Sequence, residues 1–413
     1  MRYGLVVAGC FCLLALAPPA AAQVPDSVAL PLAMPGVRQA LAYIDAGRDR
    51  NAAFLAEIGA IISPSGQEGQ RAEAVAGRMR AIGLQQVRVD DAPNAVGVLP
   101  GRSGRALVFI STLDDLATVA EHQRERGRPP HVVGDRVEGP GTNTSATTAS
   151  MLAAAEALIS AGVVPEHDLV FAAVAQEETG LVGMRRLYDE YRDRAVAWVD
   201  ILGDGRSISY GAIGIHWWRV VAHGPGGHSL RGGLPNVNQG IARAVDRILA
   251  LPHPERHADS RTVINIARIH SGAVFNHKPE EGWFSLDLRS LDAHVIADME
   301  TDVREVLRQV TEETGIGFEM EPFQLTPGGQ IEGARESELV RLAVAAARWL
   351  GTEPRLGNAG SSNMNIAVGA GSLAIGLGGE RGGGRGQPDE WADIPALQRS
   401  AKLVLLLGAG LGR

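Results

Sequence analysis

Cysteine is scarce in this chain of 413 residues, and lysine is almost absent. The two cysteines, Cys10 and Cys12, both lie near the N-terminus, so a chain that loses this segment has no thiol or disulfide chemistry. Lys278 and Lys402 are the only lysines, and arginine supplies the remaining basic residues. The net charge is −8 and no basic stripe stands out, which argues against nucleic acid as a partner.

Long hydrophobic runs are lacking beyond the N-terminus. Arg2, the apolar run 4–17 and the small residues 18–22 are typical of a signal peptide of residues 1–22, cleaved before Gln23. Val7–Cys10 resembles a lipoprotein cleavage box, but too little apolar sequence precedes Cys10. The run is short for a membrane span, so we expect no membrane contact after cleavage. The sequence therefore predicts an exported protein, periplasmic or secreted.

Helices and buried strands alternate in two separate parts of the chain. Apolar runs at 106–111, 168–175 and 195–202 indicate strands of a parallel sheet that is covered on both faces. Helices are predicted at 36–62, 67–82 and 147–161. After residue 337 the pattern returns, with helices at 337–350 and 393–407 and a strand at 372–377.

The intervening segment has a different pattern. Strands at 217–222, 262–270, 283–289 and 317–322 and helices at 235–251 and 293–314 follow the β-α-β-β-α-β order of a ferredoxin-like unit. We therefore predict an α/β domain at 23–212 and 326–413, interrupted by an α+β domain at 213–325.

Four motifs follow one another in a recognisable order: Ile110–Asp115, Gly139–Thr144, Glu177-Glu178 and Gly224–Ser229. Together with the insertion, they resemble the zinc-dependent aminoacylase, carboxypeptidase G and peptidase T family of metallohydrolases. The resemblance covers essentially the whole mature chain. It implies a zinc-aminopeptidase-like catalytic domain with a ferredoxin-like lid that also dimerises. It further implies two zinc ions, a homodimer, and hydrolysis of peptide or other linear amide bonds.

The resemblance assigns roles position by position. Glu177 matches the general base, and Glu178 matches a zinc ligand. His228 and Asn276 match the lid residues that stabilise the oxyanion. Arg289 matches an arginine that binds a carboxylate, which implies a small peptide or an N-acyl amino acid as substrate.

The acidic residues that follow two of the strands leave alternatives open. Asp114 matches an aspartate that supports the ligands, although Asp115 would match if the register slipped by one residue. Asp200 and Asp204 both remain candidates for the acidic ligand after the next strand, and Asp200 fits that position better.

Three family ligand positions are degenerate in this sequence. Thr112 (or Leu113) stands in place of the first histidine, Thr144 in place of the bridging aspartate, and Gly386 in place of a late histidine. Zinc sites ordinarily need three or four protein ligands, so we expect at most one metal ion. The remaining carboxylates need a positive charge nearby. We hypothesise that Arg381 or Arg385 supplies it, the alternative being that their loop is merely solvated.

Two functions compete at this point. The first is an exported amide or peptide hydrolase with a reduced site, either one-metal or metal-free. The second is a catalytically silent periplasmic protein that binds peptide-like or N-acyl amino acid ligands. The retained base and lid residues favour the enzyme. Trp217-Trp218 is interpreted as packing in the lid, with a substrate platform as the alternative.

Overall fold

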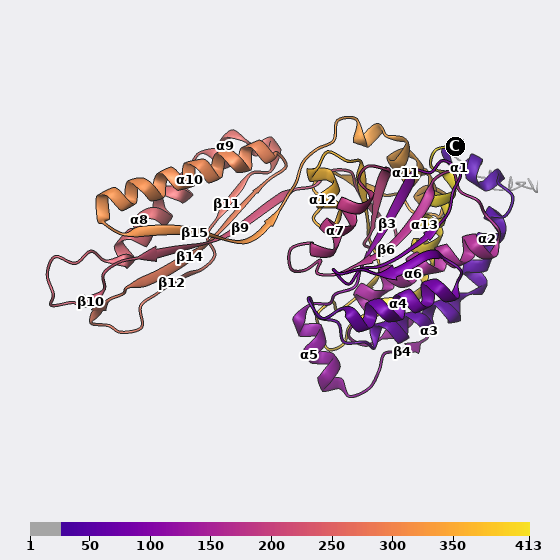
Figure 1. Ribbon diagram of the computed structural model, residues 1–413, viewed down its shortest axis with the longest axis horizontal. Coiled ribbons are helices and arrows are strands. Elements are labelled where there is room, and N and C mark those ends of the chain that lie inside the picture. The colour runs from indigo at the N-terminus through magenta and orange to yellow at the C-terminus, as the bar shows by residue number, and fades with distance from the viewer. Residues whose placement is uncertain (1–25) are drawn as a thin grey trace, which may run out of the picture.

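The computed structural model describes residues 26–413, so the predicted signal peptide and both cysteines lie outside the described range. A mixed eight-stranded sheet, in the order β1-β2-β6-β3-β7-β17-β8-β16, forms the centre of the larger unit (Figure 1). Strands β6, β3, β7 and β17 run parallel, whereas β1 and β2 pair antiparallel at one edge. The strands are β1 Gln85–Val89, β2 Ala95–Leu99, β3 Ala106–Thr112, β6 Asp168–Val174, β7 Ala195–Ile201, β8 Ser207–Ser209, β16 Arg355–Gly357 and β17 Ala374–Gly378.

Helices cover both faces of this sheet because its central strands are apolar on both sides. In β3, Leu107 and Phe109 belong to one hydrophobic cluster, while Val108 and Ile110 belong to another on the opposite face. The first face packs against α1 Asp26–Ala33, α2 Val37–Ala46, α3 Arg48–Gly59, α4 Gly69–Ala81, α6 Thr142–Ser160, α11 Glu338–Trp349 and α13 Ile394–Gly410. The second packs against α7 Val182–Tyr191 and α12 Met364–Gly369.

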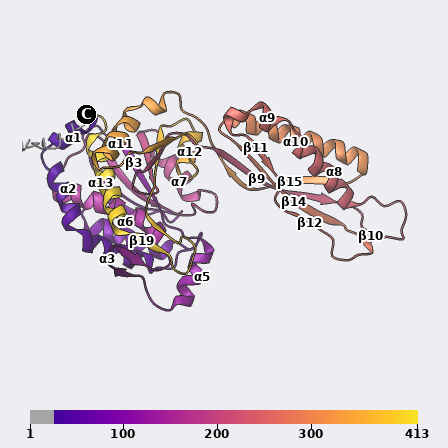
Figure 2. The ribbon, with the colours of Figure 1, turned by 180° about the vertical axis from the view of Figure 1, so that it is seen from behind.

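A second sheet forms the inserted domain, which we define as residues 214–326. Its order, β11-β14-β9-β15, with every pair antiparallel, is that of a ferredoxin-like unit. The strands are β9 Gly214–His223, β11 Val263–Asn265, β12 Ile269–Ser271, β14 Glu281–Ser290 and β15 Gly317–Thr326. Helices α8 Val237–Leu249 and α10 Ala293–Thr314 pack on this sheet, and Figure 2 shows it extending away from the larger unit. The predicted fold class is confirmed.

A small four-stranded sheet, β18-β19-β5-β4, is an element that sequence analysis did not predict. It joins β4 His131–Val133 and β5 Arg136–Glu138 to β18 Gly382–Gly383 and β19 Trp391–Asp393, and α5 Ala117–Arg126 precedes it. The sheet matters for function because it anchors the loop that contains Arg381 and Arg385.

Two of the predicted helices have different bounds in the structure. The continuous helix at 36–62 is wrong, because the chain divides at Gly47 into α2 and α3. The helix predicted from residue 147 begins at Thr142. The carboxylate of Glu390 accepts hydrogen bonds from the N–H groups of Gly141 and Asn143, at 2.9 and 3.0 Å, and so caps this first turn from a distant segment.

Between residues 26 and 413, no helix is both long and apolar enough to cross a membrane.

Candidate active site

A polar pocket of about 400 Å³ lies at the carboxyl ends of β3 and β6, where open α/β sheets commonly bind ligands. It extends to the base of the inserted domain, from which β9 and β15 contribute side chains. The lining residues are Thr112, Thr144, Glu177, Glu178, Leu181, Leu202, Ile215, Trp217, Gln324, Thr326, Ser361, Ser362, Arg381 and Arg385. We call this the central pocket.

Asp114 holds the glutamate pair in place. Its Oδ1 accepts a hydrogen bond from the Glu177 N–H at 2.8 Å, and its Oδ2 accepts one from the Glu178 N–H at 3.1 Å. The hydroxyl of Ser65 donates to the same Oδ2 at 2.6 Å. Asp115 instead forms a buried ion pair with Arg71 at 2.6 Å. This arrangement favours Asp114 as the supporting aspartate.

Glu177 is the most perturbed carboxyl group of the central pocket. Burial, followed by the nearby charges of Glu178 and Asp200, raises the pKa of Glu177 to about 8. The charge of Arg385 opposes this rise. A carboxyl group with such a pKa exchanges a proton near neutral pH, which is the property required of a general acid–base catalyst.

Glu178 forms an ion pair with Arg385, whose guanidinium donates a hydrogen bond to Oε1. Burial raises the pKa of Glu178, while Arg385 and Arg381 both lower it. Both arginines line the central pocket beside the glutamates. The hypothesis that this loop supplies positive charge to the site is therefore confirmed, and the alternative of a merely solvated loop is wrong.

The structure separates the two alternative aspartates. Asp200 is fully buried at the end of β7; its Oδ2 accepts a hydrogen bond from the Met364 N–H, and burial raises its pKa to about 6. Neither aspartate lines the central pocket, and Asp204 Oδ2 accepts hydrogen bonds from Arg399 at 2.8 and 3.0 Å. The Glu380 N–H donates to its Oδ1. Asp204 therefore has a structural role, and the structure does not bring it to Glu178.

The three degenerate ligand positions offer no ordinary metal ligand in the structure. Thr112 and Thr144 line the central pocket with neutral hydroxyl groups. Gly386 has no side chain, and its N–H donates to Glu390 Oε2 at 3.0 Å. Within residues 26–413, no three His, Cys, Asp or Glu side chains converge in a group that could hold a metal. Two arginines also occupy the pocket. These residues do not fit a two-metal centre.

The predicted oxyanion residues lie far from Glu177 within one chain. His228 belongs to β10 Gly227–His228, at the end of the inserted domain remote from the larger unit (Figure 1). Its Nε2 lies 3.2 Å from Nδ2 of Asn276, and both side chains are solvent-accessible. Neither lines the central pocket. Within one chain, His228 and Asn276 therefore do not reach Glu177, and their predicted role in stabilising the oxyanion stays a prediction.

Arg289 and Trp217 lie at the base of the inserted domain. Arg289 donates hydrogen bonds from Nε to both carboxylate oxygens of Asp287, at 2.9 and 3.2 Å. Trp217 Nε1 donates to the same carboxylate at 2.9 Å, and the Arg289 guanidinium lies 5.9 Å from the Trp217 ring centre. Trp217 lines the central pocket whereas Arg289 does not. Trp217 is thus available as a substrate platform, which the packing interpretation of the sequence had discounted.

Several pocket residues had no usable signal in the sequence. Gln324 and Thr326 reach the pocket from β15, which extends beyond residue 322, where the predicted strand ended. Glu390 fixes the loop from Arg381 to Gly386 through the hydrogen bond to Gly386. Its hydrogen-bond partners, Gly141, Asn143 and Gly386, follow no local pattern in the sequence.

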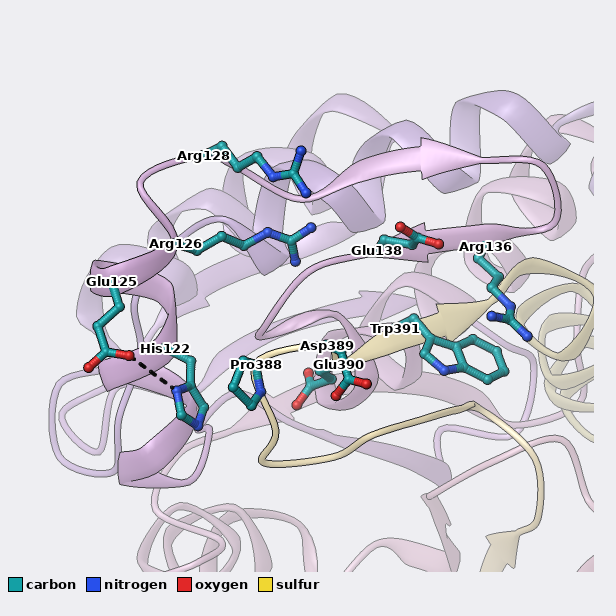
Figure 3. Close-up of a pocket in the computed structure, with 10 residues that line it drawn as sticks. All are labelled: His122, Glu125, Arg126, Arg128, Arg136, Glu138, Pro388, Asp389, Glu390 and Trp391. Atoms are coloured by element: carbon teal, nitrogen blue, oxygen red, sulfur yellow. Dashed lines mark ion pairs between the residues drawn. The ribbon is translucent and has the colours of Figure 1, made fainter.

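A second cavity, of about 550 Å³, lies near the small sheet (Figure 3). Charges of both signs line it, together with the ring of Trp391, over which the Arg136 guanidinium lies at 3.9 Å. The lining residues are His122, Glu125, Arg126, Arg128, Arg136, Glu138, Pro388, Asp389, Glu390 and Trp391. Glu177 and Glu178 are not among them, so this cavity is separate from the acid–base groups.

A glutamate pair at the edge of a parallel sheet, beside an inserted ferredoxin-like domain, defines a hydrolase of the peptidase and amidohydrolase class. The chain belongs to peptidase family M20/M25/M40, because the sequence model of that family matches residues 109–408. No curated protein matches the sequence significantly.

Solved structures of family members share the fold at low sequence identity. The aminopeptidase PepT of Bacillus cereus superposes with a TM-score of 0.74 at 19% identity, covering 89% of this chain and 99% of that one. A tripeptidase of Staphylococcus aureus gives 0.73 at 20% identity, with coverages of 88% and 98%. The YXEP protein of Bacillus subtilis, described as a dinuclear metal-binding peptidase of family M20, gives 0.65 at 14% identity, with coverages of 89% and 100%.

Proposed function

We propose that this protein is an exported hydrolase of peptide or other linear amide bonds, with Glu177 as general base and at most one bound metal ion. The observation that carries the proposal is Glu177 itself, since its pKa of about 8 allows proton exchange near neutral pH. Its placement beside Glu178 and Arg385, in a pocket large enough for a short peptide or an N-acyl amino acid, supports the same conclusion.

The chain's own residues suffice for a balanced hydrolysis. Ionised Glu177 accepts a proton from a water molecule, and the water oxygen forms a bond to the carbonyl carbon. The carbonyl electron pair moves to its oxygen. When that pair returns, the C–N bond breaks and the Glu177 carboxylic acid gives its proton to the leaving nitrogen. The products are a carboxylic acid and an amine.

His228 and Asn276 require a second chain or a large closure to take part. We therefore include a homodimer in the proposal. The exposed His228–Asn276 pair lies at the tip of the inserted domain, next to the fully exposed Phe275. Such a tip is suited to contact another molecule. Arg289 contacts Asp287 through Nε, and its two terminal nitrogens have no hydrogen-bond partner among the described residues, so they could bind a substrate carboxylate.

The decisive experiment measures amine release from tripeptides and N-acetyl amino acids by the wild type and by Glu177→Gln. We expect the variant to lose roughly 100-fold or more in kcat, because it can no longer accept a proton. Glu125→Gln, in the second cavity, is the matched control and keeps full activity. Unchanged turnover in Glu177→Gln contradicts the assignment of the base.

The competing function is a silent binding protein for peptide-like or N-acyl amino acid ligands. The neutral Thr112 and Thr144 in the central pocket favour it, because they remove two metal ligands. It predicts that wild type releases no amine from either substrate class, although such compounds raise its Tm.

A further inference from the structure

Arg381 differs from two other arginines of the larger unit. Arg71 pairs with Asp115, and Arg399 pairs with Asp204. The side chain of Arg381 is partly buried and lines the central pocket, yet no hydrogen bond or ion pair joins its guanidinium to another residue between 26 and 413. Desolvation, followed by the charge of Arg385, lowers the pKa of Arg381 to about 10.

Thr112 offers a hydroxyl group that can still donate into the same space. Asn363 Nδ2 donates to Thr112 Oγ1 at 3.3 Å, which leaves the Thr112 hydroxyl hydrogen free. Ser362 and Thr144 also line the pocket, but their hydroxyls lie by the carboxylates of Asp200 and Asp115, respectively. The free donors of the pocket are therefore Arg381 and Thr112, which belong to two separate elements.

The backbone of Arg381 is fixed, so its side chain is presented in a defined position. Its carbonyl accepts a hydrogen bond from the Asp393 N–H at 3.0 Å. The next residue, Gly382, pairs with Ala392 in the small sheet at a φ of +139°. A Cβ at Gly382 would lie 2.0 Å from the Trp391 carbonyl oxygen, so this close approach requires glycine.

We propose that Arg381, assisted by the hydroxyl of Thr112, binds the carboxylate of the ligand, so that a guanidinium takes the place of a metal ion in binding this anion. The inference rests on the proposed function for the location of the site, but it requires no turnover. A planar monoanion matches the fork of a guanidinium. A dianion would meet stronger repulsion from Glu178 and Asp200.

The test compares N-acetylglycine with N-acetylglycinamide, which differ by the carboxylate alone. Calorimetry with the full chain after EDTA treatment is expected to show at least tenfold tighter binding of N-acetylglycine to the wild type. Arg381→Met should abolish this preference, and Arg381→Lys should keep part of it, because lysine retains the charge without the fork. Arg128→Met, in the second cavity, is the matched control and should behave as wild type.

The proposal is overturned by any of three results. One is an Arg381→Met variant, folded by circular dichroism, that keeps the wild-type preference. Another is a preference that vanishes with EDTA and returns with zinc. The last is a wild type that does not distinguish the two compounds at about 10 mM, a concentration that detects even weak carboxylate binding. A protein that prefers the carboxylate but never releases amine would refute the hydrolase and leave this inference intact.

Discussion

As the proposed general base, Glu177 combines two demands that ordinarily conflict. A general base must ionise, whereas a carboxyl group beside Glu178 and Asp200 resists ionisation. In metal-dependent relatives a cation can relieve such repulsion. Here the charges come from Arg385, which pairs with Glu178, and from Arg381. The arginines make a crowded carboxylate cluster tolerable without requiring a full set of metal ligands.

The raised pKa of Glu177 has a consequence for stability. The ordinary value of 4.5 holds in the unfolded chain, and the folded value is about 8. The unfolded chain therefore loses its proton first, and the wild type loses stability as pH rises from 4.5 to 8. Glu177→Gln mimics the neutral form and avoids this loss. We expect equal Tm values near pH 4.5 and a variant more stable by a few degrees above pH 8.

Differential scanning calorimetry across this pH range checks the expectation. Glu125→Gln, which removes an exposed carboxylate, serves as the control for nonspecific loss of charge. A Tm difference for Glu177→Gln that is independent of pH would show that the carboxyl group ionises normally in the folded protein.

At the scale of elements, the loop from Arg381 to Glu390 is organised by one buried side chain. Glu390 accepts hydrogen bonds from Gly141, Asn143 and Gly386, and so ties the first turn of α6 to the arginine loop. Thr144 in that turn and Arg381 in the loop both line the central pocket. The carboxylate thus positions two walls of the site without touching ligand.

We predict that Glu390→Gln destabilises the protein by about 1–3 kcal/mol in urea unfolding. The amide oxygen can still accept from Gly141 and Asn143, but the NH₂ group then faces the Gly386 N–H and leaves that donor unpaired. Asp389→Asn alters an exposed carboxylate one residue away and is expected to change stability by less than about 0.5 kcal/mol. Equal stability of the two variants would contradict the role given to Glu390.

The elements also show what local sequence can and cannot reveal. The strands 106–111 and 168–175 were predictable because their runs are apolar on both faces, and the structure places them at β3 and β6. The start of α6 was not predictable, because its cap comes from Glu390, which lies 249 positions after Gly141 in the sequence. The small sheet escaped detection since its strands are two or three residues long.

In the candidate site too, some residues were recognisable from local sequence, whereas the placement of others depends on distant parts of the chain. Glu177, Glu178 and Asp114 were recognisable from motifs at the ends of strands, and the structure brings them together. The choice between Asp200 and Asp204 depended on Arg399, which belongs to the last helix. The separation of His228 from Glu177 depended on the length and direction of the inserted domain. Neither relation is encoded in a local pattern.

For the whole molecule, the distance between the tip of the inserted domain and the central pocket makes assembly the main question. If a homodimer places His228 of one chain near Glu177 of the other, mixed dimers recover activity from two inactive variants. Random mixing of Glu177→Gln with His228→Ala then restores about a quarter of wild-type activity, since half of the dimers contain one intact site. The assay compares the mixture with each variant alone, after subunit exchange.

The matched control mixes Glu177→Gln with wild type. Its activity should follow the fraction of chains that carry Glu177, because every chain in this mixture carries His228. Light scattering of the same samples reports the mass of two chains. Additive, near-zero activity of the mixed variants, with a monomeric mass, would refute the dimer and leave closure of the inserted domain as the route for His228.

The central claim is that arginines, and not a complete set of metal ligands, supply positive charge beside Glu177 and Glu178. The most direct measurement is elemental analysis of the purified mature protein, dialysed after exposure to excess zinc. The account predicts at most one equivalent of zinc per chain, because Thr112, Thr144 and Gly386 offer no ordinary ligand for a second ion. Two tightly held equivalents would contradict it and would mean that other side chains complete a two-metal centre.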